Sequence, residues 1–422
     1  LQFLLKQSHN LSREVQLHHL SQGGLFRTLQ QLREGEIPLS FGSFEAIRDT
    51  CFITTERKGL FHEISSTAYI GSDTVRTRAI LGYSVDRLFD NALSLTGTRP
   101  MLVISSGTYV EGSVGLNDGL VRYSPPYIEE QQPLNGQVVE DSSFGDFTLA
   151  AGALDSILGS YRSRLEEYDP SLFNVIEGGI YDAQELTAYS HVYVDGDLVL
   201  KSDSGYLEQT EIIICKHNLT VEGRITISKP IELIAGENVF IKDSSQVTNA
   251  VIFAKGGIYF QGFCNATGQF LSEKQIMVTG HASLRFPSYL VVPVNSEKVF
   301  GDPEVAILKN SSFAGSVLVY QRNESSDQDG SFNLPGRVKV ESSASFTGGI
   351  YCEGNAEIYG KIDGFIHAEN LEQMDGVTRW TNLLKNTQLY RHTLSPDYPL
   401  PPVFNSMQEL SFLEIRRVDN LQ

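Results

Sequence analysis

Charged side chains recur at two outward positions of a repeated pattern in the second half of the chain. Such rows could supply the carboxylates of a polysaccharide-cleaving enzyme, which must converge on one groove about 5 to 9.5 Å apart. The best grouping is Asp195, Asp197, Glu222 and Arg224. Elsewhere the two rows mix both signs of charge with Gln, Ser and Phe, as solvated faces do. A ladder of exposed charges therefore explains the grouping better than a catalytic centre.

Other motifs that could bind a metal or a phosphate are incomplete. The stretch "SSDQDGSFN" (residues 325–333) contains Asp-x-Asp-Gly, the first half of a calcium-binding loop. The twelfth residue counted from Ser325 is Gly336, where such a loop has Glu, so we favour a polar loop. His281 is interpreted as a surface or packed histidine. No phosphate-binding loop, nucleophile elbow or HExxH motif occurs. We therefore assign no catalytic residue, no metal site and no cofactor.

The second position of the repeat is apolar in most copies, and it supplies the candidate binding residues. We expect Tyr193, Phe240, Tyr259 and Met277 to form one column on an outer face. A contiguous apolar stripe is rarely left in water. Either a helix at 147–168 or the carboxy-terminal tail covers this column, or the column binds a protein or glycan partner.

The repeat itself is nine residues long. Its copies are "VYVDGDLVL" at 192, "LTVEGRITI" at 219, "VFIKDSSQV" at 239, "IYFQGFCNA" at 258, "IMVTGHASL" at 276, "AILKNSSFA" at 306, "VKVESSASF" at 338 and "IYCEGNAEI" at 350. Positions one, three and nine are mostly apolar, and position seven is mostly small. Position five is Gly, Asp, Asn or Ser, which suit a bend. The pattern predicts a strand, a bend and a second strand.

The spacing of these copies predicts a mainly β fold, a parallel β-solenoid over residues 187–370. Successive starts at 219, 239, 258 and 276 are 20, 19 and 18 residues apart, which gives coils of about 20 residues. The coils should stack about 4.8 Å apart with positions one, three, seven and nine inward. In "GGIYCEGNAEIYGKIDGFIHAEN" (residues 348–370), Gly360 and Gly364 would let neighbouring backbones pass closely, while isoleucines 358, 362 and 366 fill the core.

The remaining chain divides into four further segments. Residues 1–100 should form an amino-terminal helix over 1–34 and antiparallel strands with a hairpin turn at Gly71-Ser72-Asp73. Residues 101–123 should form an early coil or cap, 124–186 a linker and helical insertion, and 371–422 a capping tail. The apolar stripe of the first helix comprises Leu4, Leu11, Val15, Leu25, Leu29 and Leu32, although Gly23-Gly24 would weaken the helix.

Composition argues against two kinds of partner. The net charge of −18, without any Lys/Arg cluster, argues against nucleic acid and against adsorption to an anionic membrane surface. The four cysteines stand apart in apolar contexts and are interpreted as buried thiols. No apolar run is long enough to span a membrane. Because the chain starts at Leu1 in "LQFLL", we expect an apolar anchor or signal upstream as its connection to a membrane.

Two segments near the amino terminus carry a family resemblance. "LSQGGLFRTLQQLREGEI" followed by "EISSTAYIGSDTVRTRAIL" resembles minor pilins and pseudopilins of the type IV pilin class, and the rest is similar to uncharacterised surface proteins of Bacteroidetes-type bacteria. The resemblance implies a long helix before a β-hairpin layer and a periplasmic or extracellular location at the cell envelope. We expect a non-enzymatic structural or interaction module, as in a pilus- or secretion-like assembly or an adhesin. The alternative is a polysaccharide-active lyase or glycoside hydrolase.

Overall fold

The computed structural model describes residues 2–33, 44–48, 51–83, 91–124, 133–140, 149–294, 302–322, 335–391, 401, 403 and 410–418. The predicted calcium-type loop at 325–333 lies outside these residues. The chain forms two compact units, one of residues 1–86 with 396–422 and the other of residues 87–395. The smaller unit is therefore discontinuous, and the larger one is inserted into it.

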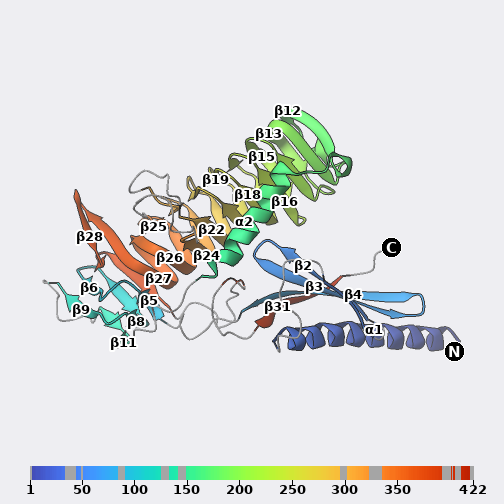
Figure 1. Ribbon diagram of the computed structural model, residues 1–422, viewed down its shortest axis with the longest axis horizontal. Coiled ribbons are helices and arrows are strands. Elements are labelled where there is room, and N and C mark those ends of the chain that lie inside the picture. Colours follow the sequence, from blue (N-terminus) through green and yellow to red (C-terminus); the bar gives the residue numbers. More distant parts are fainter. Residues whose placement is uncertain are drawn as a thin grey trace. The chain divides into compact units, whose positions relative to one another are not determined.

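The smaller unit is a long helix packed on a five-stranded antiparallel sheet of order β1-β2-β3-β4-β31 (Figure 1). The helix and the turn between Ile70 and Asp73 agree with the sequence-based prediction. Its elements are α1 (Gln2–Arg33), β1 (Phe44–Arg48), β2 (Cys51–Lys58), β3 (Phe61–Ile70), β4 (Asp73–Tyr83) and β31 (Leu410–Val418).

The contact between α1 and the sheet combines leucines with small polar residues. The buried apolar side chains of the helix are Leu17, Leu25, Leu29 and Leu32. Val15, expected in this stripe, is 49% exposed, because the buried face follows a different side of the helix. Gly24 allows the helix to lie close to the sheet, since a Cβ there would lie 2.6 Å from the Ser66 hydroxyl oxygen. Ser21 donates to the Ser66 carbonyl at 2.7 Å, so helix and sheet approach closely.

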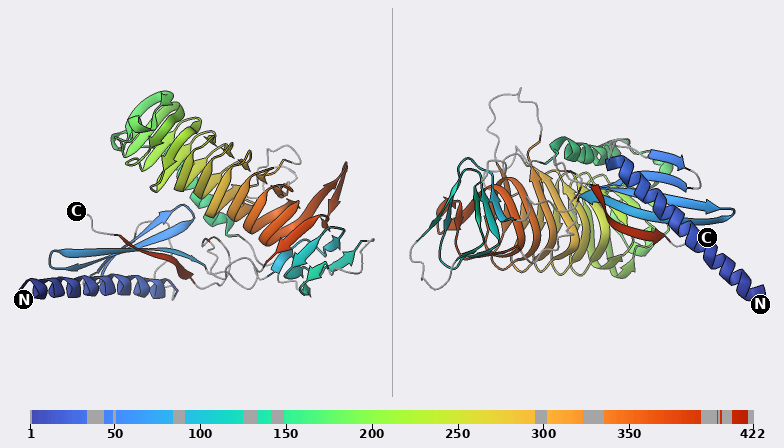
Figure 2. Two further views of the ribbon diagram at one scale, coloured as in Figure 1. Left: turned by 180° about the vertical axis from the view of Figure 1, so that it is seen from behind. Right: turned by 90° about the horizontal axis from the view of Figure 1, so that it is seen from below.

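The larger unit is a parallel β-solenoid, as predicted (Figures 1 and 2). Most coils carry two strands, one of which bends so that a coil has three sides, and each strand pairs in parallel with its equivalent one coil away. Residues 219, 239, 258 and 276 occupy the same register position. The strands of these coils are β12 (Asn174–Tyr181), β13 (His191–Tyr206), β14 (Ile212–Cys215), β15 (Leu219–Ile227), β16 (Ile231–Ala235), β17 (Val239–Ile241), β18 (Gln246–Ala254), β19 (Gly257–Phe260), β20 (Asn265–Ser272), β21 (Gln275–Val278), β22 (Ser283–Pro293), β23 (Val305–Ile307), β24 (Ser312–Tyr320), β25 (Gly336–Val340), β26 (Ser345–Ile358) and β27 (Gly360–Asp375).

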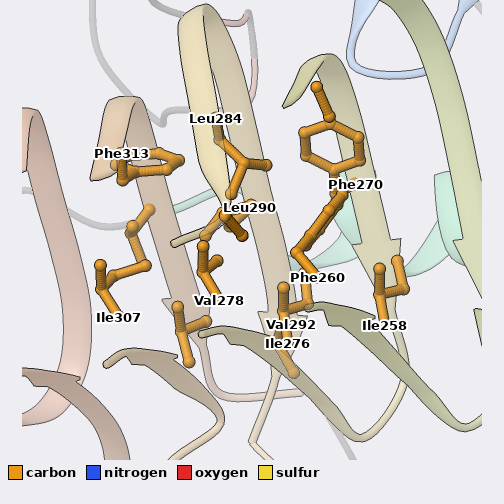
Figure 3. Close-up of a cluster of buried hydrophobic side chains, with 14 of the residues drawn as sticks. Ile258, Phe260, Phe270, Ile276, Val278, Leu284, Leu290, Val292, Ile307 and Phe313 are labelled. Carbon is orange, nitrogen blue, oxygen red and sulfur yellow. The ribbon is translucent and has the colours of Figure 1, made fainter. Parts of the chain in front are cut away.

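The interior is filled by the side chains that the repeat places inward (Figure 3). In the second copy these are Leu219, Val221, Ile225 and Ile227, each at most 1% exposed. The copy placed at 306 is out of frame by one residue, because Val305 rather than Ala306 pairs with Ile276. Four apolar residues follow one another there, so alternation alone could not fix the frame.

Bends occur where the sequence supplies residues that tolerate a positive φ. Asp243, Gly262 and Gly280 stack at one corner with φ of 57°, 72° and 65°. Isoleucines 358, 362 and 366 are buried as expected. At Gly360 a Cβ would lie 2.6 Å from the Ser342 carbonyl oxygen, and at Gly364 it would overlap the Gly348 carbonyl. Glycine is required there because adjacent coils touch through their backbones.

The first coils in the sequence stack on the last ones. Leu93 of β5 pairs with Ile366 of β27, and Val110 of β7 pairs with Leu389 of β30. The expected early coil at 101–123 is thus part of the solenoid, at its carboxy-terminal end (Figure 2). The segment 371–422 is not one capping tail, since it supplies the last coil and then β31 of the other unit. These elements are β5 (Asn91–Leu95), β6 (Met101–Ile104), β7 (Tyr109–Glu111), β8 (Ser113–Leu116), β9 (Leu120–Tyr123), β10 (Leu134–Asn135), β11 (Val138–Glu140), β28 (Thr378–Thr381), β29 (Leu383–Leu384) and β30 (Thr387–Tyr390).

A helix follows β11 and leads back along the solenoid to β12. This helix, α2 (Ala151–Glu166), lies inside the segment where a helix was predicted, 147–168, and it runs along the stacked strands (Figure 1). A short helix, α3 (Ala183–Leu186), adds two buried side chains, Ala183 and Leu186, to the core near β12.

Candidate functional site

Two outer columns of side chains run along adjacent sides of the solenoid. We call the first the covered column; it contains Tyr193, Ile214, Ile234, Phe253, Leu271, Val291, Leu318, Tyr351 and His367. We call the second the aromatic column; it contains Phe240, Tyr259 and Met277 in three successive coils. The prediction that these three share a register is confirmed. Tyr193 does not belong with them, because it pairs with Ile214 on the other side of the coil.

The covered column is buried beneath α2. The Tyr161 ring stacks on Phe253 at 5.5 Å, and Leu154, Ile157 and Leu158 of the helix are at most 1% exposed. Beyond the helix, the Tyr168 ring stacks on Tyr193 at 3.6 Å. The predicted helix therefore does cover an outer apolar column, but not the one that includes Phe240 and Tyr259.

Ion pairs hold the polar side of α2 to neighbouring coils. Arg162 contacts Glu273 at 2.6 Å and Arg164 contacts Glu232 at 2.6 Å. Asp155 accepts a hydrogen bond from the buried Tyr320 hydroxyl at 2.9 Å. Burial raises the pKa of Tyr320 well above its usual range, so the phenol stays protonated and donates. The helix is thus fixed by specific contacts at several coils.

The aromatic column is only half-buried, and its ring faces are occupied. Phe240 and Tyr259 stack with centroids 5.0 Å apart and planes 14° apart. The Lys242 ammonium lies 5.0 Å from the centre of the Phe240 ring, and Gln275 donates to the Tyr259 hydroxyl at 2.5 Å. Because stacked rings cover each other's faces, the column offers mainly ring edges, one hydroxyl and the Met277 thioether to a partner.

Further exposed apolar side chains lie outside the predicted column. At a neighbouring corner, the Phe263 ring is 67% exposed and stacks on His281 at 5.0 Å. The β27–β28 hairpin exposes Met374, Val377 and Trp380 by 39%, 97% and 50%. Phe263 and His281 both occupy outward position six of the repeat, so the sequence did indicate that they are exposed. The hairpin lies beyond the last repeat copy, and the repeat gave no prediction for it.

A charged cluster continues the side of the solenoid that carries the aromatic column. Arg337 contacts Glu357 at 2.6 Å and Glu372 at 3.0 Å, and the three side chains are 7%, 7% and 11% exposed. Lys339 lies 3.7 Å from both Glu357 and Glu341. Each carboxylate lies beside a cation, and Glu357 and Glu372 are largely shielded from solvent. The arrangement suits a structural ion network better than an acid and a base facing a substrate.

The acidic grouping singled out in the sequence is divided among separate pairs. Asp195 contacts Lys216 at 2.8 Å, and Glu222 contacts Lys201 at 3.1 Å. Asp197 accepts hydrogen bonds from the Asn218 backbone and side chain, both at 2.9 Å. The hydrogen bond from Lys216 lowers the pKa of Asp195, and the backbone hydrogen bond from Asn218 lowers that of Asp197. A general acid needs a raised pKa, so both shifts oppose that role.

The shifted pKa values of Glu353 and of two cysteines also fit structural roles. Burial raises the pKa of Glu353, but this carboxylate accepts a hydrogen bond from the Gln321 backbone at 2.6 Å. All four cysteines are buried, and burial raises the pKa of Cys215 and Cys264 to about 11, which disfavours the reactive thiolate. Among the residues that the structure describes, no group of three or more His, Cys, Asp and Glu side chains could hold a metal ion. No described helix is long and apolar enough to cross a membrane.

Comparisons with known proteins do not assign a family to this chain. No protein-family model matches the chain, and no curated protein matches it. A search of solved structures finds the competence-associated pilin ComZ from Thermus thermophilus at 9% sequence identity, covering 96% of this chain and 97% of that one. The TM-score is 0.18, which is too low to carry an argument.

Proposed function

We propose that this chain is a non-enzymatic protein of the cell envelope or cell surface, in which the smaller unit joins an assembly and the solenoid is the structural or interaction module. The observation that carries the proposal is the insertion of residues 87–395 between β4 and β31 of a complete helix-and-sheet unit. An element inserted between neighbouring strands leaves the host unit's core intact. The smaller unit can therefore keep its contacts with an assembly while the solenoid is attached to it.

The helix supplies a surface for assembly. Its buried face is used by the sheet, whereas Val15, Leu20 and Phe26 are 49%, 38% and 55% exposed. We propose that this exposed face packs against other subunits of a pilus- or secretion-like assembly. The half-buried aromatic column and the Phe263–His281 pair are the proposed contacts for a protein or glycan at the envelope.

The test is a comparison of Val15→Glu with Glu14→Gln in cells that make this protein with its full encoded sequence. Fractionation and surface labelling should find the wild type in the envelope fraction. In cells that make Val15→Glu, the amount of protein in the assembly should fall by at least half. The purified variant should melt like the wild type, because an exposed side chain contributes little to stability. Glu14→Gln, a neighbouring change that adds no charge, should behave like the wild type. A protein found in the cytosol, or cleavage of a polysaccharide by the purified chain, would contradict the proposal.

A further inference from the structure

The solenoid ends in an open strand edge at β12. In the part of the chain that the structure describes, the pairing partner of β12 is β13, and β12 is the last strand at this end of the solenoid (Figure 1). The backbone groups of β12 that are not bonded to β13 therefore face away from the coils. The sequence of β12, "NVIEGGIY", has no Lys, Arg or Pro, the residues that commonly protect an edge strand. Val175 and Ile180 on this strand are 49% and 72% exposed. Such an edge is a template for pairing with another chain.

The register of β12 is self-complementary. The strand bends at Gly178, where its pairing with β13 shifts, so residues 174–177 and 179–181 lie on two sides of one corner. Consider a two-fold axis that passes through this corner, perpendicular to the axis of the solenoid. It would pair the side before the corner in one copy with the side after the corner in the other copy. Antiparallel pairing about the midpoint of Glu177 and Gly178 then sets Val175 opposite Ile180. The two most exposed apolar side chains of the edge thus meet across the axis.

We propose that a second copy of this chain docks on the β12 edge by this antiparallel pairing, so that two solenoids continue one another end to end. The inference does not depend on the proposed envelope role. The contact is limited to residues 174–177 and 179–181 on either side of the corner, because the strand bends between them. At the corner, the Glu177 carbonyl accepts a hydrogen bond from the Tyr181 hydroxyl at 2.8 Å. Two-fold pairing closes the assembly as a dimer, whereas head-to-tail stacking would propagate.

Charge sets the conditions of this association. Glu177 is the one charged residue of β12, and the axis brings it next to its own copy. Like charges at diagonal positions weaken strand pairing, and each chain has a net charge of −18. The dimer should therefore tighten as salt screens the repulsion. Unspecific charge-driven contacts would weaken under the same change.

Sedimentation velocity on the full chain, over a range of concentrations, tests the association. The wild type should show a monomer–dimer equilibrium. Ile180→Glu should raise the dissociation constant at least about tenfold, since two symmetric sites each gain a charge. Glu177→Gln should lower it about fivefold. Both positions are exposed, so the melting temperature should stay the same at concentrations where the wild type is monomeric. A wild type that remains monomeric up to its solubility limit, or a dimer indifferent to Ile180→Glu, would overturn the proposal.

Cross-linking tests the register. Residues directly opposite in antiparallel strands have Cα atoms about 4.5–5.5 Å apart, within disulfide range. The double variant Val175→Cys/Ile180→Cys should therefore form a covalent dimer on mild oxidation. Val175→Cys alone is the matched control, because its copy lies several residues away across the axis and the native cysteines are buried. Equal cross-linking of the two variants would reject this register.

Discussion

The covered column and the aromatic column are built by the same kind of strand, yet only one is removed from water. Both place apolar side chains in register on an outer side of the solenoid. The covered column is buried because α2 lies over it, with Leu154, Ile157, Leu158 and Tyr161 buried and the Tyr161 ring stacked on Phe253. The aromatic column protects itself in part by stacking Phe240 on Tyr259. Alternation within a strand therefore determines which side chains point outward. A segment distant in the sequence determines whether those side chains are buried or exposed.

The largest effect should come from Phe253→Ala in the covered column. Phe253 is fully buried between its neighbouring coils and Tyr161, so its removal leaves a cavity. We expect a loss of about 3–5 kcal/mol in the free energy of unfolding. Urea denaturation followed by circular dichroism would measure it. A loss below about 1 kcal/mol would mean that α2 does not seal this column.

The second prediction concerns pH and the far end of the covered column. Burial lowers the pKa of His367, stacked on Tyr351 at 4.9 Å, from 6.5 to about 4. Between these values the unfolded chain binds a proton that the folded chain does not. Stability of the solenoid should therefore fall as pH decreases from about 6.5 to about 4, by about 3 kcal/mol from this residue.

His367→Phe, which keeps an aromatic ring against Tyr351, should remove that part of the pH dependence in denaturation curves. His281→Phe is the matched control, because His281 is exposed on the outer surface. The comparison is between the slopes of unfolding free energy against pH, so a change in absolute stability does not obscure it. Equal slopes for wild type and His367→Phe would show that this end of the column is open to water.

The smallest effect should come from Tyr259→Ala in the aromatic column. Tyr259 is half-buried, and its replacement removes the stack with Phe240 and the hydrogen bond from Gln275. We expect a loss of about 1–2 kcal/mol in unfolding free energy. Tyr259→Phe should recover most of it, because the ring stack remains. A loss as large as that of Phe253→Ala would mean that the two columns are equally enclosed.

The coil architecture could be predicted because its signals are local. Inward side chains alternate within each strand, and Asp243, Gly262 and Gly280 mark the corner that they occupy. The assignment of Tyr193 failed because the nine-residue pattern occurs at more than one corner of a coil. The copy at 192 spans the corner before the one that the copy at 219 spans. A sequence pattern gives strand, bend and strand, but it does not label the side.

Long-range partners had no local signal at all. Nothing in the residues around Leu93 indicates pairing with Ile366, and nothing in α2 specifies which column it will cover. The charged cluster was also missed, because Arg337, Glu357 and Glu372 are spaced 20 and 15 residues apart, so no single repeat length brings them together. Their convergence depends on register, which is fixed only once the coils stack.

The return of the first coils onto the last has a mechanical meaning. The chain enters the solenoid at β5 and leaves it after β30, and these strands belong to directly stacked coils. Tension applied between residues 91 and 390 would load the hydrogen bonds that join β5 to β27 and β7 to β30. Residues 174–358 lie outside that path of force. The rest of the solenoid could keep its shape under a pull that strains its point of attachment.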